Sequence, residues 1–286
     1  MRRLGLVYDR VRWEEKEIAK KAEEKGEKII KIDAKEVILS VSDYGDLREF
    51  FGDVVLQRCI SYYRGFNITS FLENNGIDVI NSKKTAEVCG NKLLTTLTLS
   101  KAKIPTPKTK VAFTPESALK ALDEIGYPAV LKPITGSWGR MVSPLKDKES
   151  ALAIIEVREQ LTNPIDHIYY IQEYVKRPPR DVRAIVVGDE LVSAVYRYAS
   201  DSDWRTNVAR GGITKSYQIT KDFEELIIKA ARAVGGGVVG VDAMESPDGL
   251  VIHEVNNTVE FKGAQRVTER SIAEAIVNYA LNLLKR

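Results

Sequence analysis

Val238-Val-Gly-Val-Asp-Ala-Met-Glu-Ser-Pro-Asp-Gly-Leu-Val-Ile-His-Glu-Val-Asn256 contains two apolar runs on either side of a short polar stretch. That stretch, Ser246-Pro-Asp-Gly249, is a strong turn sequence, because proline presets its own φ and glycine accepts the left-handed conformation. The whole segment therefore predicts a β-hairpin. Folding it about position 248 places Asp242 directly opposite Glu254 and puts Asn256 two residues further along the same face.

The same hairpin predicts a cation site. Two carboxylates and an amide oxygen would converge between apolar neighbours, and such hard oxygen ligands suit magnesium carrying nucleotide phosphates better than they suit zinc. The alternative is a solvated acidic end of a hairpin. Repulsion between two half-buried carboxylates disfavours this alternative, since a bound cation relieves it. His253 is expected to point away from the Glu254 face, because side chains alternate along a strand.

The composition is that of an ordinary soluble globular chain. The 286 residues are 44% hydrophobic and 29% charged, which excludes disorder, collagen-like repeats and a disulfide scaffold. A net charge of only +3 provides no global polycation, so no nucleic-acid partner is expected. The two cysteines form no CxxC motif, and neither a signal-peptide pattern nor a run of ~20 apolar residues occurs. These features favour a cytoplasmic protein with no membrane partner.

Strand-like and helix-like segments alternate over the first ~85 residues, which predicts a small open α/β domain. No GxGxxG follows the first strand, and this argues against dinucleotide binding there. The helix face from Glu14 to Lys25 is expected to be solvated, and residues 85–100 are expected to form one helix. Ile104-Pro-Thr-Pro107 predicts a stiff linker between lobes. The rest of the chain predicts two mixed α+β lobes that face each other.

A lysine leaves a predicted buried strand in Lys132-Pro-Ile-Thr-Gly136-Ser-Trp-Gly-Arg140. A glycine-containing loop after it could present backbone N–H groups and cations to phosphates, as a lid would. An ordinary hairpin connection is the alternative, since GxxxxGK[ST] occurs nowhere in the chain. Gln172–Val175 predicts a strand whose backbone could pair with a purine edge, or simply an edge strand.

A third polar segment, Trp204–Gly212, carries an arginine and an asparagine two residues apart before a Gly-Gly turn. Arg205 and Asn207 could both reach a phosphoryl group. The alternative is a surface loop held by salt bridges.

Taken in this order, these pieces resemble the ATP-grasp superfamily over nearly the whole chain. The segments that carry the resemblance are Cys89-Gly-Asn-Lys92, Lys132-Pro133, Gly136–Arg140, Gln172–Val175, Arg180-Asp-Val-Arg183, Arg205-Thr-Asn207, Asp242 and Glu254-Val-Asn256. Within the superfamily the sequence is similar to the RimK-type branch, and more closely to the LysX-type ligases of carrier-mediated lysine biosynthesis. The segments specific to that branch are Tyr8-Asp-Arg10, Cys59-Ile-Ser61 with Arg64-Gly65, Gly136–Gly139 and Asn257-Thr-Val-Glu-Phe-Lys262.

The resemblance implies an ATP-grasp fold of the α/β class, built from α+β lobes behind an open α/β domain. Residues 1–90 would form that pre-ATP-grasp domain, 91–175 the central lobe with the phosphate lid, and 176–286 the C-terminal lobe with the metal site. ATP and two magnesium ions would be the cofactors. The residues implied to bind the nucleotide are Lys92 and Lys132 at the phosphates, the lid Gly136, Ser137, Trp138, Gly139 and Arg140, the adenine segment Gln172, Glu173, Tyr174 and Val175, and Asp181 or Arg183 near the ribose and phosphates.

The remaining implied roles concern the metal and the reacting groups. The magnesium ligands would be Asp242, Glu254 and Asn256. Arg205 would be catalytic and would steady an acyl phosphate together with Asn207. The residues implied to hold the amino-acid substrate are Arg197, Val208, Ala209, Thr258, Val259, Glu260, Phe261 and Lys262. A homotetramer is also expected from the resemblance.

The resemblance further implies an acyl-phosphate ligase. The C-terminal glutamate of a small acidic amino-group carrier protein (LysW-like) would be phosphorylated on its γ-carboxylate, and the α-amino group of α-aminoadipate would then attack. The sister enzymes of the arginine route use glutamate and carry Gly-Phe after Glu-Phe-Lys, where this chain has Gly263-Ala264, which favours α-aminoadipate. Dual specificity, a RimK-like protein glutamate ligase and a non-catalytic nucleotide-binding module are the alternatives.

Overall fold

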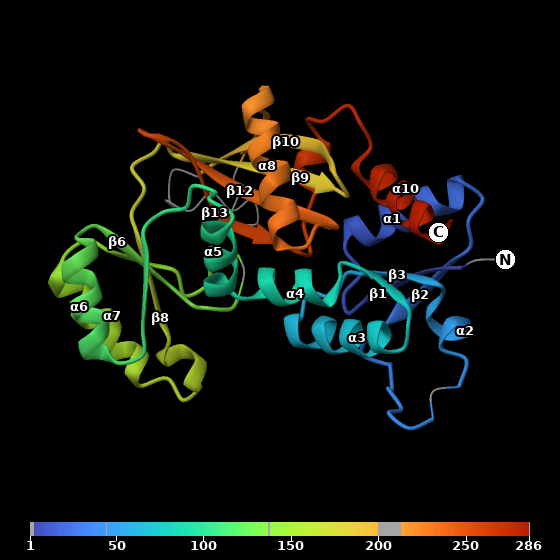
Figure 1. Ribbon diagram of the computed structural model, residues 1–286, viewed down its shortest axis with the longest axis horizontal. Coiled ribbons are helices and arrows are strands. Elements are labelled where there is room, and N and C mark those ends of the chain that lie inside the picture. The colour runs from blue at the N-terminus through green and yellow to red at the C-terminus, as the bar shows by residue number, and fades with distance from the viewer. Residues whose placement is uncertain (1–2, 44, 137, 200–212, 286) are drawn as a thin grey trace.

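The computed structural model describes residues 3–43, 45–136, 138–199 and 213–285 (Figure 1). The first sheet is parallel, with strand order β2-β1-β3-β4. Both faces of β1 are buried, which is why its sequence is a continuous apolar run. The elements of this unit are β1 (Leu4–Tyr8), α1 (Trp13–Glu24), β2 (Ile29–Asp33), α2 (Leu47–Phe51), β3 (Val54–Gln57), α3 (Tyr62–Asn74) and β4 (Asp78–Ile80).

The second sheet is antiparallel, with order β5-β8-β6-β7, and helices α6 and α7 pack against it (Figure 1). It has a separate apolar core, in which Tyr169 and Leu122 are among the largest fully buried side chains. Its elements are β5 (Thr109–Ala112), α6 (Pro115–Ile125), β6 (Ala129–Lys132), β7 (Ser143–Leu145), α7 (Lys148–Glu159), the 3₁₀ turn Pro164–His167 and β8 (Tyr169–Glu173).

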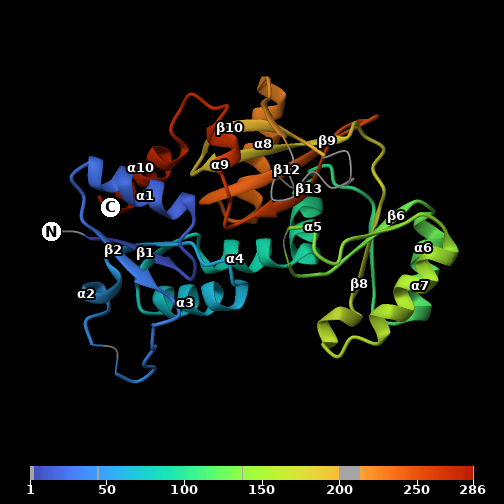
Figure 2. The same ribbon diagram turned by 180° about the vertical axis from the view of Figure 1, so that it is seen from behind.

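The third sheet is antiparallel, with order β11-β10-β9-β12-β13. Helices α5 and α8 share one of its apolar cores, while α10 shares another core with β9, β10 and the first sheet. Both views show α10 beside α1, so the closing helix joins the first and third sheets (Figures 1 and 2). The elements are β9 (Arg180–Val187), β10 (Glu190–Tyr198), β11 (Ile213–Ser216), α8 (Lys221–Val234), β12 (Val238–Ser246), β13 (Gly249–Asn256), α9 (Lys262–Gln265) and α10 (Ile272–Leu284).

The helix expected over residues 85–100 is two helices, α4 (Lys83–Gly90) and α5 (Lys92–Lys101). The chain is extended at Asn91, whose side-chain oxygen accepts hydrogen bonds from the N–H groups of Leu93 and Leu94. Such a side chain caps a new helix, and the break places Lys92 at the first position of α5. None of the helices in the described part of the chain is long and apolar enough to cross a membrane.

The expectation that α1 presents a solvated face from Glu14 onward is wrong for the first turn of the helix. Glu14 and Glu15 are only 4% and 2% exposed, because Glu14 lies against the segment that follows β13 and Glu15 lies against two arginines. Arg58 and Arg12 supply cations to Glu15, which satisfies the requirement that a buried carboxylate be paired.

Candidate active site

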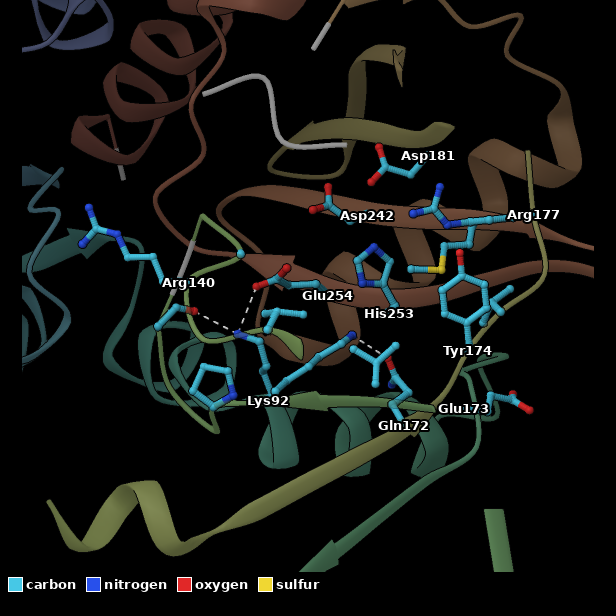
Figure 3. Close-up of a pocket in the computed structure, with 18 of the residues that line it drawn as sticks. Lys92, Arg140, Gln172, Glu173, Tyr174, Arg177, Asp181, Asp242, His253 and Glu254 are labelled. Atoms are coloured by element: carbon cyan, nitrogen blue, oxygen red, sulfur yellow. Dashed lines mark hydrogen bonds and ion pairs between the residues drawn. The ribbon is translucent and has the colours of Figure 1, made fainter. Parts of the chain in front are cut away.

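The predicted hairpin forms, and its register is the expected one at the acidic end. Asp242 pairs with Glu254, whereas Ala243 pairs with Ile252, so a β-bulge lies between the two pairs. His253 is the extra residue of the bulge. The bulge breaks the alternation of side chains, and His253 lines the same cavity as Glu254 (Figure 3). The expectation that it points away is therefore wrong.

A first cavity lies between the second and third sheets and collects most of the residues expected at a nucleotide (Figure 3). Strands β6 and β8 supply one wall, and β12 and β13 supply the other. The expected residues that line it are Lys92, Lys132, Gly136, Gly139, Arg140, Gln172, Glu173, Tyr174, Val175, Asp181, Arg197, Asp242 and Glu254, and the others include Val142, Arg177, Met244 and His253.

Lys132 is a buried cation in this cavity. Its side chain is at the end of β6, and the residue is 8% exposed. The ammonium Nζ donates to Oε1 of Gln172 at 2.6 Å. Burial lowers the pKa of Lys132 to about 8, because the charged form has lost its water. A polyanionic ligand would supply a countercharge to this ammonium.

The polar side chains of β8 are already used by the protein. The Gln172 amide donates to Thr109 at 3.0 Å and to the Tyr170 hydroxyl at 3.1 Å, so Gln172 positions Lys132. The carboxylate of Glu173 accepts from the backbone N–H of Lys108 at 2.8 Å, which ties β8 to the start of β5.

Asp242 is at the centre of a network of cations. Arg183 contacts both of its oxygens, with Nη2 at 2.7 Å from Oδ2, and Nη2 of Arg197 lies 3.0 Å from Oδ2. Arg197 also makes a two-point contact with Asp181, both distances being 2.8 Å. Burial alone would raise the pKa of Asp242, but the two guanidinium groups hold it well below its usual range.

Glu254 faces a different cation. Its Oε1 lies 3.4 Å from Nζ of Lys92, and the same Nζ donates to the carbonyl of Gly136 at 2.8 Å. Burial opposes ionisation of Glu254, yet Lys92 lowers the pKa of the carboxyl overall. Lys92 thus joins the β13 carboxylate to the start of the expected lid.

The donor set at the hairpin fits a hard cation. Asp242 and Glu254 are ionised cross-strand neighbours, and Asn256 donates to Oδ2 of Asp242 at 3.3 Å, so its amide lies beside that carboxylate. Carboxylate and amide oxygens are the ligands that Mg²⁺ prefers. In the described ranges no three His, Cys, Asp or Glu residues group as a metal site. The charges of the two carboxylates are neutralised by Arg183, Arg197 and Lys92.

A second cavity of about 880 Å³ opens between the first sheet and the segment after β13. It shares Gly136, Arg197 and Glu254 with the first cavity. The two spaces therefore adjoin at Gly136, Arg197 and Glu254. The other expected residues that line the second cavity are Trp138, Arg183, Asn256, Thr258, Glu260 and Lys262.

Two expected substrate residues are not at either cavity. Val259 and Phe261 are fully buried, and the Phe261 ring packs edge-on against Trp13 with centroids 5.7 Å apart. Their alternation with polar neighbours is the signal that assigns their side chains to the core, so Thr258, Glu260 and Lys262 supply the side chains of this segment that line the second cavity.

Five expected residues, Ser137, Arg205, Asn207, Val208 and Ala209, lie outside the described part of the chain. Beside Ser137, the guanidinium of Arg140 lies 5.0 Å from the centre of the Trp138 ring. Among the described residues, sequence reasoning missed His253 and Arg177 at the first cavity. Arg177 comes shortly after the expected adenine segment, and this closeness in sequence could have indicated that it lies at the same cavity. No local pattern indicates the bulge at His253.

Comparison with known proteins gives two adjoining family matches. The LysX preATP-grasp domain matches residues 4–88, and the RimK-like ATP-grasp domain matches residues 89–280. The alpha-aminoadipate–LysW ligase LysX of Sulfurisphaera tokodaii is 37% identical over 99% of both chains. The glutamate–LysW ligase ArgX of Sulfolobus acidocaldarius is also 37% identical, over 98% of both.

Solved structures agree with this result. A RimK domain ATP-grasp protein from Sphaerobacter thermophilus has a TM-score of 0.81 at 26% identity, and the match covers 98% of this chain and 99% of that one. The ATP-grasp ligase PsnB shares the fold, with a TM-score of 0.75 at 18% identity over 98% of both chains.

The fold and the two joined cavities define an ATP-dependent carboxylate–amine ligase of the ATP-grasp class. More narrowly, the chain belongs to the RimK-like ATP-grasp family and carries a LysX-type pre-ATP-grasp domain. The expected ATP-grasp fold and the expected ligase activity are thereby confirmed.

Proposed function

We propose that this ligase joins the α-amino group of α-aminoadipate to the C-terminal glutamate γ-carboxylate of an acidic, LysW-like carrier protein. The meeting of the two cavities at Glu254 and Arg197 carries the proposal, because it lets a nucleotide on one side contact a carboxylate on the other. The LysX relative is named for this reaction, which supports the choice of substrates.

In the first half-reaction, ATP occupies the first cavity with its phosphates at Lys92 and Lys132. A carrier carboxylate oxygen forms a bond to the γ-phosphorus, the bond from that phosphorus to the bridging oxygen breaks, and ADP leaves. Asp242, Glu254 and Asn256 would hold two magnesium ions. When bound, these ions neutralise charge on the transferred phosphoryl group.

In the second half-reaction, the neutral α-amine attacks the acyl carbon from the second cavity. The bond from carbon to the phosphate oxygen breaks, inorganic phosphate leaves, and the phosphate takes up the extra proton of the nitrogen. We assign Arg205 and Asn207 to the acyl phosphate. Positioning and electrostatics account for the catalysis required of the protein.

We propose that residues 1–90 and 176–286 enclose the second cavity and that the central lobe, 91–175, closes over the nucleotide. The walls of the two cavities support this division, since the second is lined chiefly from the first and third sheets.

A glutamate substrate is the second candidate, because the ArgX relative is as similar to this chain as the LysX relative. One methylene separates the two amino acids, and a pocket discriminates such a difference by only ~1–3 kcal/mol. Selectivity of about 10- to 200-fold is therefore the most that the pocket itself can supply.

The test is an incubation of the purified protein with ATP, Mg²⁺, carrier and each amino acid separately. The mass of the carrier and the release of ADP are measured together. We expect the carrier to gain one α-aminoadipyl residue faster than one glutamyl residue. A carrier that lacks its C-terminal glutamate is the matched control and should gain neither. A carrier left unmodified by both amino acids, while ATP still binds, would overturn the proposal.

A further inference from the structure

The segment after β13 lines the second cavity, yet its backbone is held by the first domain. Asn257, Thr258, Glu260 and Lys262 all line that cavity. They lie in a segment, 257–262, that belongs to neither a strand nor a long helix. An irregular segment at a binding site needs external contacts to fix its conformation.

Glu14 of α1 provides the most direct of these contacts. One of its oxygens, Oε1, accepts hydrogen bonds from the backbone N–H groups of Phe261 at 3.1 Å and Lys262 at 3.0 Å. The residue is 4% exposed, so water does not replace these bonds readily. Charge-assisted bonds of this kind are stronger than neutral ones.

Three further contacts hold the same segment. Arg58, which is 3% exposed, donates to the carbonyl of Val259 at 2.9 Å. Asn81, which is 4% exposed, donates to the carbonyl of Asn257 at 2.6 Å. Nη1 of Arg12 lies 3.3 Å from Oε1 of Glu260.

The four side chains that hold segment 257–262, namely Glu14, Arg58, Asn81 and Arg12, are called the clamp. The clamp is also anchored within the first domain. Glu15 accepts from Arg58 at 3.1 Å and from Arg12 at 2.7 Å, and this fixes both guanidinium groups. All of these side chains lie on α1 or directly after β3 and β4, at one end of the parallel sheet. Side chains at this end of the sheet therefore fix the conformation of segment 257–262.

We propose that Glu14, with Arg58 and Asn81, positions segment 257–262 and thereby sets the affinity of the second cavity for the amino-acid substrate. Glu14 is a positioning residue, because it acts through backbone groups of the segment. The kinetic part rests on the proposed function. The structural part does not, since the hydrogen bonds exist without any substrate.

The geometry permits a test that separates the effect of side-chain length at position 14 from the effect of its charge. Both backbone bonds go to a single oxygen, so Glu14→Gln keeps an acceptor of the same length without the charge. Glu14→Asp keeps the charge but withdraws the oxygen by one methylene. Glu17→Asp, on the same helix, is the matched control for the change of side-chain length.

Hydrogen exchange at the amides of Phe261 and Lys262 is measured first, in the ligand-free protein. Steady-state kinetics follow with the amino acid and with ATP. We expect Glu14→Asp to accelerate exchange at both amides and to raise the KM of the amino acid about tenfold or more, as the loss of buried hydrogen bonds requires. The KM of ATP should stay within about twofold, and Glu17→Asp should resemble the wild type. Glu14→Gln should be impaired less than Glu14→Asp, because it keeps the acceptor in place and loses only the charge.

Equal exchange in Glu14→Asp and the wild type would overturn the proposal, and so would a Glu14→Gln protein as impaired as Glu14→Asp. A Glu14→Asp protein that no longer binds ATP would make Glu14 a residue of general stability and would also overturn it. If the wild type acts on no amino acid, the proposed function fails, and the exchange measurement still tests the clamp.

Discussion

Replacing Lys132 by methionine should make the nucleotide-free protein more stable while weakening ATP binding. The ammonium of Lys132 is buried, and burial lowers its pKa from 10.5 to about 8. This difference corresponds to about 3 kcal/mol of stability lost to burying the charge at neutral pH. Methionine has a similar volume and no charge. It leaves Oε1 of Gln172 without its donor, which costs about 1–2 kcal/mol. The net gain is about 1–2 kcal/mol.

The pH dependence of this gain has a definite sign. Below about pH 8 the Lys132 ammonium is charged in both the folded and unfolded chains, so the variant keeps its full advantage. Between about pH 8 and 10.5 only the unfolded chain retains the proton, and the stability of the wild type rises with pH. The advantage of the variant should therefore shrink across this range and pass through zero. Above it the variant should be the less stable protein by about 1–2 kcal/mol, because only the lost hydrogen bond to Gln172 then remains.

Urea denaturation of nucleotide-free protein at several pH values measures the effect, and the shift of the midpoint on adding ATP measures binding. Lys120→Met, at an exposed lysine of α6, is the matched control and should change little. The reasoning is refuted if Lys132→Met is destabilised equally at pH 7 and pH 10. It is also refuted if ATP stabilises the variant as much as the wild type.

Three further outcomes are expected. Glu254→Gln should fold normally but lose turnover by about 10²-fold or more, as measured by ADP release, because a shared metal ligand is lost; near wild-type turnover would remove the hairpin from the chemistry. Backbone exchange over residues 138–142 should slow when an ATP analogue and Mg²⁺ are added, since a lid excludes water over the phosphates, and unchanged exchange would make the loop an ordinary turn. The KM of the acidic carrier should rise from low to moderate salt much more than the KM of ATP, because exposed charges are screened beyond ~8 Å at physiological salt; indifference to salt would mean that the carrier is recognised without charge.

The hairpin illustrates how far the sequence alone leads. Its turn residues and its alternation predict that Asp242 and Glu254 are partners, and the register confirms this pairing. The bulge lies in the pairing of β12 with β13, between Asp242 and Ala243, and no local pattern encodes it. The position of His253 was therefore not predictable, although its neighbour was.

The buried charges show the same limit. The sequence of α1 resembles a solvated face, because Glu14 and Glu15 are followed by many charged residues. Their burial depends on Arg58 and on the backbone at Phe261, and both are distant in sequence. The break at Asn91, in contrast, was missed although a local signal for it exists, since asparagine before a helix is a known start signal.

The separate core of the second sheet has a consequence for the order of events at the site. Residues 104–107 and Pro178-Pro179 connect this sheet to the rest, and proline makes both connections stiff. Helix α5 shares the core of the third sheet, and α10 joins the third sheet to the first. Lys92 therefore belongs to the unit formed by these two sheets, whereas Lys132 belongs to the second sheet. The side chain of Lys92 donates to the carbonyl of Gly136 and its backbone N–H donates to the carbonyl of Ile134, both at 2.8 Å, so these two bonds link α5 to the loop after β6. We expect a polyphosphate to compete for the Lys92 ammonium, so that ATP entry breaks the bond to Gly136 and connects the second sheet to the third through its own phosphates.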